Sequence, residues 1–176
     1  MKKKAVMNGI DVIDKYSDLF EGKRLGLITG PTGINKSFKS TIDILNENYN
    51  LTALYSPEHG IRGNLQAGAA VDTYIDEKTG ITVYSLYGKN KKPSLEILKD
   101  IDVLIMDIQD IGSRYYTYLY TMAYCMESCV EYNKTFVVLD RINPIGGEKV
   151  EGNILDSEFK SFVGLYPVTN RYGLTI

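Results

Sequence analysis

Three side chains that can transfer a proton or bind an anion stand close together near residue 60. Glu58 is followed directly by His59, the single histidine of the chain, and Arg62 comes three residues later. A carboxylic acid beside an imidazole and a fixed cation can protonate the leaving oxygen of a substrate, so this stretch is a candidate general acid/base site. Glycoside hydrolysis requires such an acid, together with a second group that stabilises or attacks the anomeric carbon. A structural interpretation, in which Glu58 caps a helix or pairs with Arg62, fits these residues equally well.

Aspartates that follow apolar runs are candidates for the second group. Asp107, Asp110 and Asp140 lie at or just beyond the ends of such runs, and Arg114 and Arg141 lie near them. Turn formation explains the glycines and prolines of these stretches, but it does not explain the charged residues. We therefore expect these side chains to meet at one functional rim.

A competing hypothesis is nucleotide binding. Residues 30–37 nearly match the phosphate-binding pattern of glycine, four residues and then Gly-Lys-Ser/Thr, with Asn35 in place of the second glycine. Asparagine tolerates positive φ better than most residues, and Asp107 could hold magnesium. The missing glycine makes this the weaker hypothesis.

Tyrosine is abundant, with fourteen residues in the chain. A group of five follows Arg114 directly: Tyr115, Tyr116, Tyr118, Tyr120 and Tyr124. Those spaced by four share one helix face, which is typical of core packing. We expect Tyr115 or Tyr116, at the mouth of the helix, to be the exception that faces a ligand.

Strand and helix patterns alternate along the chain. Strands are predicted at residues 24–29, 51–55, 81–86, 102–107 and 135–140, and helices near residues 10–20 and at 38–46, 94–99 and 115–132. This order predicts an α/β fold, a three-layer domain with a mostly parallel sheet flanked by helices. The near-continuous apolar runs place at least the last two strands at the centre. Because ligands bind beyond the carboxyl ends of parallel strands, the polar stretches described above should converge there.

Composition excludes several classes of function. The 176 residues carry 20 basic and 22 acidic side chains, so the net charge of -2 disfavours binding to nucleic acid or to an anionic membrane. Cys125 and Cys129 lie four apart on a predicted helix and are expected to be core residues, and a Cys/His zinc cluster has too few donors. Lysines at positions 2–4 precede an apolar run too short for a signal peptide. The chain as given is expected to be cytoplasmic, or exported if a leader has been removed.

Five strings in the same order resemble the NamZ-like exo-β-N-acetylmuramidases. These strings are residues 26–33, 56–63 (Ser-Pro-Glu-His-Gly-Ile-Arg-Gly), 84–88, 107–118 and 139–147, with shorter matches at 150–152 and 161–164. The resemblance implies a Rossmann-like catalytic domain spanning residues 1–176. Its implied activity is removal of terminal N-acetylmuramic acid from the non-reducing ends of peptidoglycan fragments, with no cofactor and no metal.

The resemblance also implies a set of site residues. Glu58 would be the general acid, and Asp110 or Asp140 would assist at the anomeric carbon. Substrate would contact His59, Arg62, Arg114, Tyr116, Arg141, Asn143 and Arg171. An arginine among these suits a bidentate contact to the lactyl carboxylate of muramic acid. The separation of the two carboxyl groups, or assistance by the N-acetyl group, would decide the stereochemistry.

Two departures from the family are visible. Gly30 stands where the family more often has asparagine, and family members carry a C-terminal domain after the string at residues 171–176. A carbohydrate-binding fragment without turnover is therefore a further hypothesis beside the glycosidase.

Overall fold

A single six-stranded sheet organises the molecule. The computed structural model describes residues 5–63, 73–88 and 91–176. In it the strands lie in the order β3-β4-β2-β1-β5-β6. Their bounds are β1 Leu25–Thr29, β2 Leu51–Ser56, β3 Tyr74–Ile75, β4 Thr82–Ser85, β5 Val103–Asp107 and β6 Thr135–Val138. All neighbouring pairs are parallel except β3 and β4, so the α/β fold with a mostly parallel sheet is confirmed.

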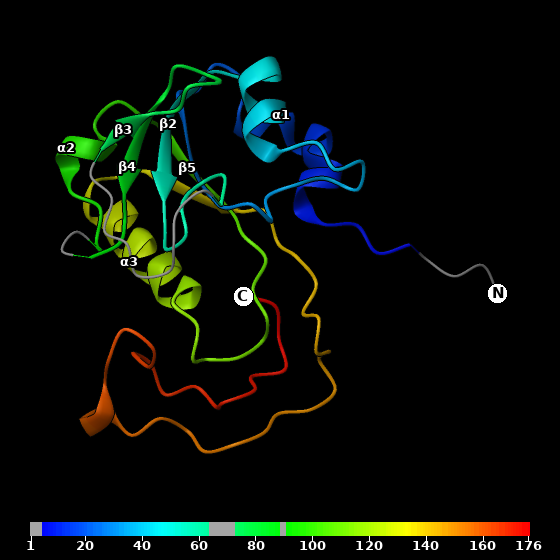
Figure 1. The fold of residues 1–176 in the computed structure, drawn as a ribbon, viewed down its shortest axis with the longest axis vertical. Helices are drawn as coiled ribbons and strands as arrows, with labels where there is room; N and C mark the ends of the chain where they lie inside the picture. The colour runs from blue at the N-terminus through cyan, green and yellow to red at the C-terminus, as the bar shows by residue number, and fades with distance from the viewer. Residues whose placement is uncertain (1–4, 64–72, 89–90) are drawn as a thin grey trace.

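Helices cover both faces of this sheet (Figure 1). The 3-10 helix η1 (Gly9–Leu19) and α1 (Thr41–Asn48) pack on one face, while α2 (Leu95–Leu98) and α3 (Tyr118–Glu131) pack on the other. The alternation along β1 explains the two cores, because successive side chains of a strand point to opposite faces. Leu27 enters the core under α1, and Ile28 enters the core under α3.

Gly26 allows the second of these cores to pack tightly. A Cβ atom at this position would lie 2.7 Å from the Tyr55 ring and 2.9 Å from the Ile101 side chain. The fully buried Tyr55 ring thus uses the space that the glycine leaves, and its hydroxyl donates to the Ile97 carbonyl oxygen at 2.6 Å.

Some sequence predictions about the elements were wrong. The strand predicted at 135–140 is not central, because β6 is the edge strand of the described sheet. The strand is apolar because both of its faces contact a core. Phe136 packs against the core under α3, and Val137 packs against the core under α1. The helix predicted at 38–46 begins only at Thr41, because Phe38 has a positive φ of 62° and Ser40 caps the helix. The short antiparallel strand β3 was missed.

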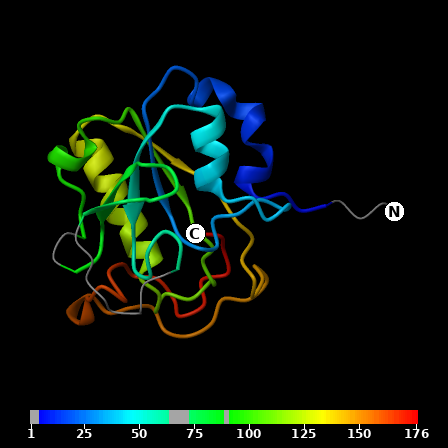
Figure 2. The same ribbon diagram turned by 45° about the horizontal axis from the view of Figure 1, so that its top comes forward.

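A long irregular segment follows β6. Residues 142–176 contain one short 3-10 helix, η2 (Ser157–Phe159), and pass below the carboxyl ends of the parallel strands in both views (Figures 1 and 2). A bridge between Arg171 and Ser113 attaches this segment to the loop before α3, and a second bridge, between Arg171 and Glu151, lies within the segment itself. The segment therefore closes one side of the rim where a ligand is expected.

Candidate active site

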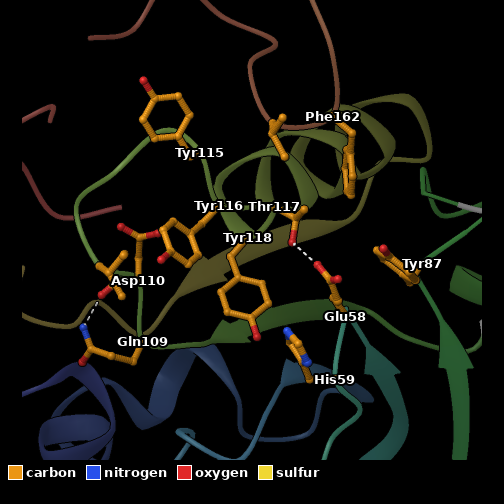
Figure 3. Close-up of a pocket in the computed structure, with 12 residues that line it drawn as sticks. Glu58, His59, Tyr87, Gln109, Asp110, Tyr115, Tyr116, Thr117, Tyr118 and Phe162 are labelled. Carbon is orange, nitrogen blue, oxygen red and sulfur yellow. Dashed lines mark hydrogen bonds between the residues drawn. The ribbon is translucent and has the colours of Figure 1, made fainter. Parts of the chain in front are cut away.

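A pocket of about 510 Å³ opens at the carboxyl ends of the strands. Glu58 and His59 come from the loop after β2, and Tyr87 comes from the loop after β4. Residues 109–111 and 115–117 lie between β5 and α3, Tyr118 is the first residue of α3, and 162–163 belong to the irregular C-terminal segment. Figure 3 shows the labelled side chains around this space. Segments far apart in sequence thus meet at one rim.

Glu58 is presented by a tight turn. The Gly60 amide donates to the Pro57 carbonyl oxygen at 3.4 Å, and His59 has a φ of 76° inside this turn. One carboxylate oxygen of Glu58, Oε2, accepts a hydrogen bond of 3.1 Å from the Thr117 hydroxyl (Figure 3). The turn and the threonine together fix the direction of the Glu58 side chain.

Two phenols surround the Glu58 carboxylate. The negative charge of Glu58 is the main factor that raises the pKa of the Tyr87 hydroxyl. Burial, followed by the same charge, raises the pKa of Tyr118. Both phenols therefore keep their protons at neutral pH and can act as hydrogen-bond donors. The Tyr118 hydroxyl points toward His59 in Figure 3.

Asp110 is the second carboxylate of the pocket, and its side chain is only 6% exposed. Its Oδ2 accepts hydrogen bonds from the Gly112 amide at 2.6 Å and from the Tyr172 hydroxyl, while Oδ1 is buried without a hydrogen-bond partner. Burial, and then the bond to Asp110, raise the pKa of Tyr172. Asp110 is thus anchored through one oxygen, while the other is buried and forms no hydrogen bond.

Gly112 is needed for this anchor. Its φ is 76°, and an added Cβ would overlap the Asn143 side chain. Asn143 itself donates to the Leu174 carbonyl oxygen at 2.8 Å and accepts from the Ile145 amide at 3.0 Å. Asn143 therefore supports the loop of Asp110 from behind and does not line the pocket.

Arg141 lies outside the pocket, in a buried ion pair. Its guanidinium donates to both carboxylate oxygens of Asp107, at 2.6 and 2.9 Å, and to the Ile34 carbonyl oxygen at 2.9 Å. Asp107, which is fully buried, also accepts from the Thr41 hydroxyl. The predicted substrate contact of Arg141 has no support in this geometry, because Nε and Nη2 donate inside the protein and the residue does not line the pocket.

Two further predicted arginines are also engaged by the protein. Arg62 donates to both carboxylate oxygens of Asp76, at 2.6 and 2.8 Å. Arg114 is buried and donates to the carbonyl oxygens of Asn153 at 2.7 Å and Val168 at 2.6 Å. Neither arginine lines the pocket.

The remaining predicted residues, Asp140 and Arg171, lie outside the pocket lining as well. Asp140 is exposed and accepts from the Thr175 hydroxyl at 2.8 Å. Arg171 pairs with Glu151 at 2.7 Å and donates to the Ile145 carbonyl oxygen. The pocket therefore unites Glu58, His59, Asp110 and Tyr116 of the predicted set, and it leaves the others in structural contacts.

The tyrosines divide between core and pocket. Tyr120 is fully buried, and its hydroxyl donates to the Arg114 carbonyl oxygen at 2.7 Å. Tyr124 stacks on Phe162, with ring centroids 6.1 Å apart. Tyr115 and Tyr116 are about half exposed and line the pocket, as their position at the helix mouth predicted.

The glycine-rich loop after β1 does not have the geometry of a phosphate site. A phosphate-binding loop leads directly into a helix N-terminus, whereas α1 begins at Thr41, five residues after Lys36. Asp107, the expected magnesium ligand, is occupied by Arg141 and Thr41. The nucleotide-binding hypothesis therefore gains no support.

Two features are absent from the residues that the structure describes. These residues contain no group of three or more His, Cys, Asp or Glu side chains placed to hold a metal ion. No helix among them has the length and apolar character required to cross a bilayer.

A family model and a curated relative both match the chain, and both carry the name NamZ. A family model described as exo-beta-N-acetylmuramidase NamZ, N-terminal, matches residues 25–176. The peptidoglycan beta-N-acetylmuramidase NamZ of Bacillus subtilis (strain 168) is 57% identical to the chain, over 99% of the chain and 43% of the relative.

Two solved structures are also similar. Both are crystal structures of DUF1343 family proteins from Bacteroides fragilis NCTC 9343. One has a TM-score of 0.88 at 53% identity and is matched over 96% of this chain and 43% of its own. The other has a TM-score of 0.84 at 40% identity, over 98% of this chain and 44% of its own. The chain thus spans less than half the length of the relatives that it matches.

Proposed function

The chain belongs to the exo-β-N-acetylmuramidase NamZ family, whose N-terminal part it matches, and from this premise we propose that its pocket binds a terminal N-acetylmuramic acid residue of peptidoglycan fragments for hydrolysis. The observation that carries the proposal is the pairing of Glu58 and Asp110 in one aromatic-lined pocket. Most glycosidases use two carboxyl groups that flank the scissile bond as their catalytic groups.

Glu58 is the general acid in this proposal. Thr117 holds Oε2, which leaves Oε1 to carry the proton that is transferred. The proton passes to the glycosidic oxygen, the bond between that oxygen and the anomeric carbon breaks, and water supplies the hydroxyl that the anomeric carbon gains. Tyr87 and Tyr118, whose phenols remain protonated, stabilise the carboxylate that is left behind.

Asp110 is the second carboxyl group. Its Oδ2 is held by Gly112 and Tyr172, so in this proposal the side chain turns to present the buried, unpartnered Oδ1 to the anomeric carbon. Asp140 does not reach the pocket lining and is left out of the mechanism. The anomer released first, read by NMR, distinguishes direct attack by Asp110 from activation of a water molecule.

Aromatic side chains supply the binding surface for the sugar ring. Tyr115, Tyr116 and Phe162 all line the pocket. Aromatic faces pack on apolar surface while phenolic hydroxyls remain free for hydrogen bonds, which suits a ring that carries hydroxyl groups.

The proposal is tested with a chromogenic N-acetylmuramide. We expect Glu58→Gln to lower the rate of N-acetylmuramic acid release by about a hundredfold or more, since general acid catalysis contributes on this scale. Glu96→Gln, at an exposed glutamate of α2, is the matched control and should keep the rate of the unmodified chain. Equal rates for the two variants would overturn the assignment of Glu58.

A further inference from the structure

The pocket is poor in positive charge. Two acidic side chains line it, Glu58 and Asp110. Among the lining residues that the structure describes, His59 is the one that can carry a positive charge. A substrate that bears a carboxylate would be repelled by the two acids unless a cation compensated for them.

The arginines that would ordinarily bind a carboxylate are engaged elsewhere. Arg62 and Arg141 form bidentate pairs with aspartates, and Arg171 pairs with Glu151. Arg114 donates to backbone carbonyl oxygens. Moving any of these side chains into the pocket would leave a partner without its charge or its donor.

His59 is placed at the rim with an unusual backbone conformation. Its φ of 76° lies in the left-handed region, where glycine is the usual residue. Its imidazole is exposed, and it lies beside Tyr118 at the pocket wall (Figure 3). A strained residue of this kind at a binding site indicates that the side chain itself is needed.

N-acetylmuramic acid differs from N-acetylglucosamine by a lactyl ether that ends in a carboxylate. We propose that the His59 imidazolium binds this carboxylate and thereby selects muramic acid over glucosamine. The inference rests on the proposed function, since it takes muramic acid as the ligand. A charge-assisted hydrogen bond from an imidazolium to a carboxylate is short and strong, whereas the neutral hydroxyl of glucosamine offers no charge to bind.

Lys91 is the competing cation. Its Nζ lies 4.2 Å from the centroid of the Phe162 ring, and that ring lines the pocket. The ammonium group is held over an aromatic face, where it already has a favourable partner. Lys91 is not itself among the residues that line the pocket, which makes it a suitable control.

The test measures binding of three sugars to the chain by calorimetry or NMR titration: N-acetylmuramic acid, its neutral lactyl carboxamide and N-acetylglucosamine. His59→Asn removes the charge and keeps a residue that tolerates positive φ. We expect the preference for the acid over the carboxamide to fall by about tenfold in His59→Asn and to remain in Lys91→Gln. Loss of the preference in Lys91→Gln alone, or its survival in His59→Asn, would overturn the inference.

The outcome is separable from that of the proposed function. If the unmodified chain prefers the acid and loses this preference in His59→Asn, the inference stands even where no product is released. If the unmodified chain hydrolyses the muramide but does not discriminate between acid and carboxamide, the function stands and the inference fails.

Discussion

The buried ion pair of Arg141 and Asp107 gives a prediction that separates a structural role from a substrate contact. Arg141 makes two hydrogen bonds to the Asp107 carboxylate and one to the Ile34 carbonyl oxygen, and the side chains of Arg141 and Asp107 are 5% and 0% exposed. Arg141→Met would leave the Asp107 carboxylate buried, with the Thr41 hydroxyl as its described side-chain donor. Removing one partner of a buried pair costs about 3–5 kcal/mol, a large part of the ~5–15 kcal/mol that stabilises a typical domain.

The assay is urea unfolding followed by circular dichroism. With a slope of about 2 kcal/mol per molar urea, we expect the midpoint of Arg141→Met to fall by about 2 M. Arg141→Lys keeps the charge but loses the planar fork, so its midpoint should fall by about half as much. Adding Asp107→Asn to Arg141→Met removes the unpaired charge, and the double variant should lose less stability than the sum of the single variants.

A different result would refute this reasoning. If Arg141→Lys unfolded at the same urea concentration as the unmodified chain and bound N-acetylmuramic acid more weakly, the arginine would be a substrate contact. The substrate contact predicted from the sequence would then be right.

Two further predictions concern the loops of the rim. Arg62 lowers the pKa of the buried Asp76 carboxyl to about 2, so the pair stabilises the fold by about 2 kcal/mol above pH 4. About half of this should be lost by pH 3, where the Asp76 carboxyl of the unfolded chain is protonated while that of the folded chain is still ionised. Urea midpoints at pH 7 and pH 3 measure this loss, which Arg62→Gln should largely abolish. Gly112→Ala should destabilise the chain by about 2 kcal/mol or more, because its φ is positive and the added Cβ would overlap Asn143. In the same variant sugar binding should weaken through displacement of Asp110, and unchanged affinity would contradict the anchoring role of the Gly112 amide.

The strands could be predicted because burial on both faces leaves a direct pattern. Residues 103–106 of β5, for example, are all apolar, and each predicted strand overlaps an observed one. The same pattern could not distinguish a central strand from an edge strand. Phe136 and Val137 of β6 are covered on both faces while one edge of the strand is open, and hydropathy does not record the edge.

Part of the pocket followed from topology. Glu58 and Asp110 lie after parallel strands, and the rule that such ends meet at one rim brings them together. The same rule could have selected Tyr87, which follows β4 directly. Tyr172 and Phe162 come from an irregular segment without periodicity, so no pattern marked their contact with the site.

The arginines show why residue type and position in the sequence could not distinguish a substrate contact from a structural ion pair. An arginine beside a strand end has the same appearance in sequence whether it faces a ligand or an aspartate. The partner of Arg62 is Asp76, which follows the two-residue strand β3 that no pattern predicted. The partners of Arg114 are backbone carbonyl oxygens, which every residue has. The role of each arginine can therefore be assigned only from its distances to partner groups in the folded chain.

The location of the pocket is explained by what lies at the topological switch point of the sheet, where the chain connections leave β1 and β5 in opposite directions. The chain proceeds from β1 to β2 on one side and reaches β5 on the other, and a crevice outside β1 and β5 is where ligands bind in many open sheets. Here Thr29 donates to the Asp107 carbonyl oxygen at 2.9 Å, and the Asp107 carboxylate is bound by Arg141. These contacts join the carboxyl ends of β1 and β5. The larger pocket lies between the loops after β2 and β5, where the turn at Glu58 faces the aromatic start of α3. The arginines near the rim stabilise the scaffold, and in our proposal the recognition of a charged ligand therefore falls to His59.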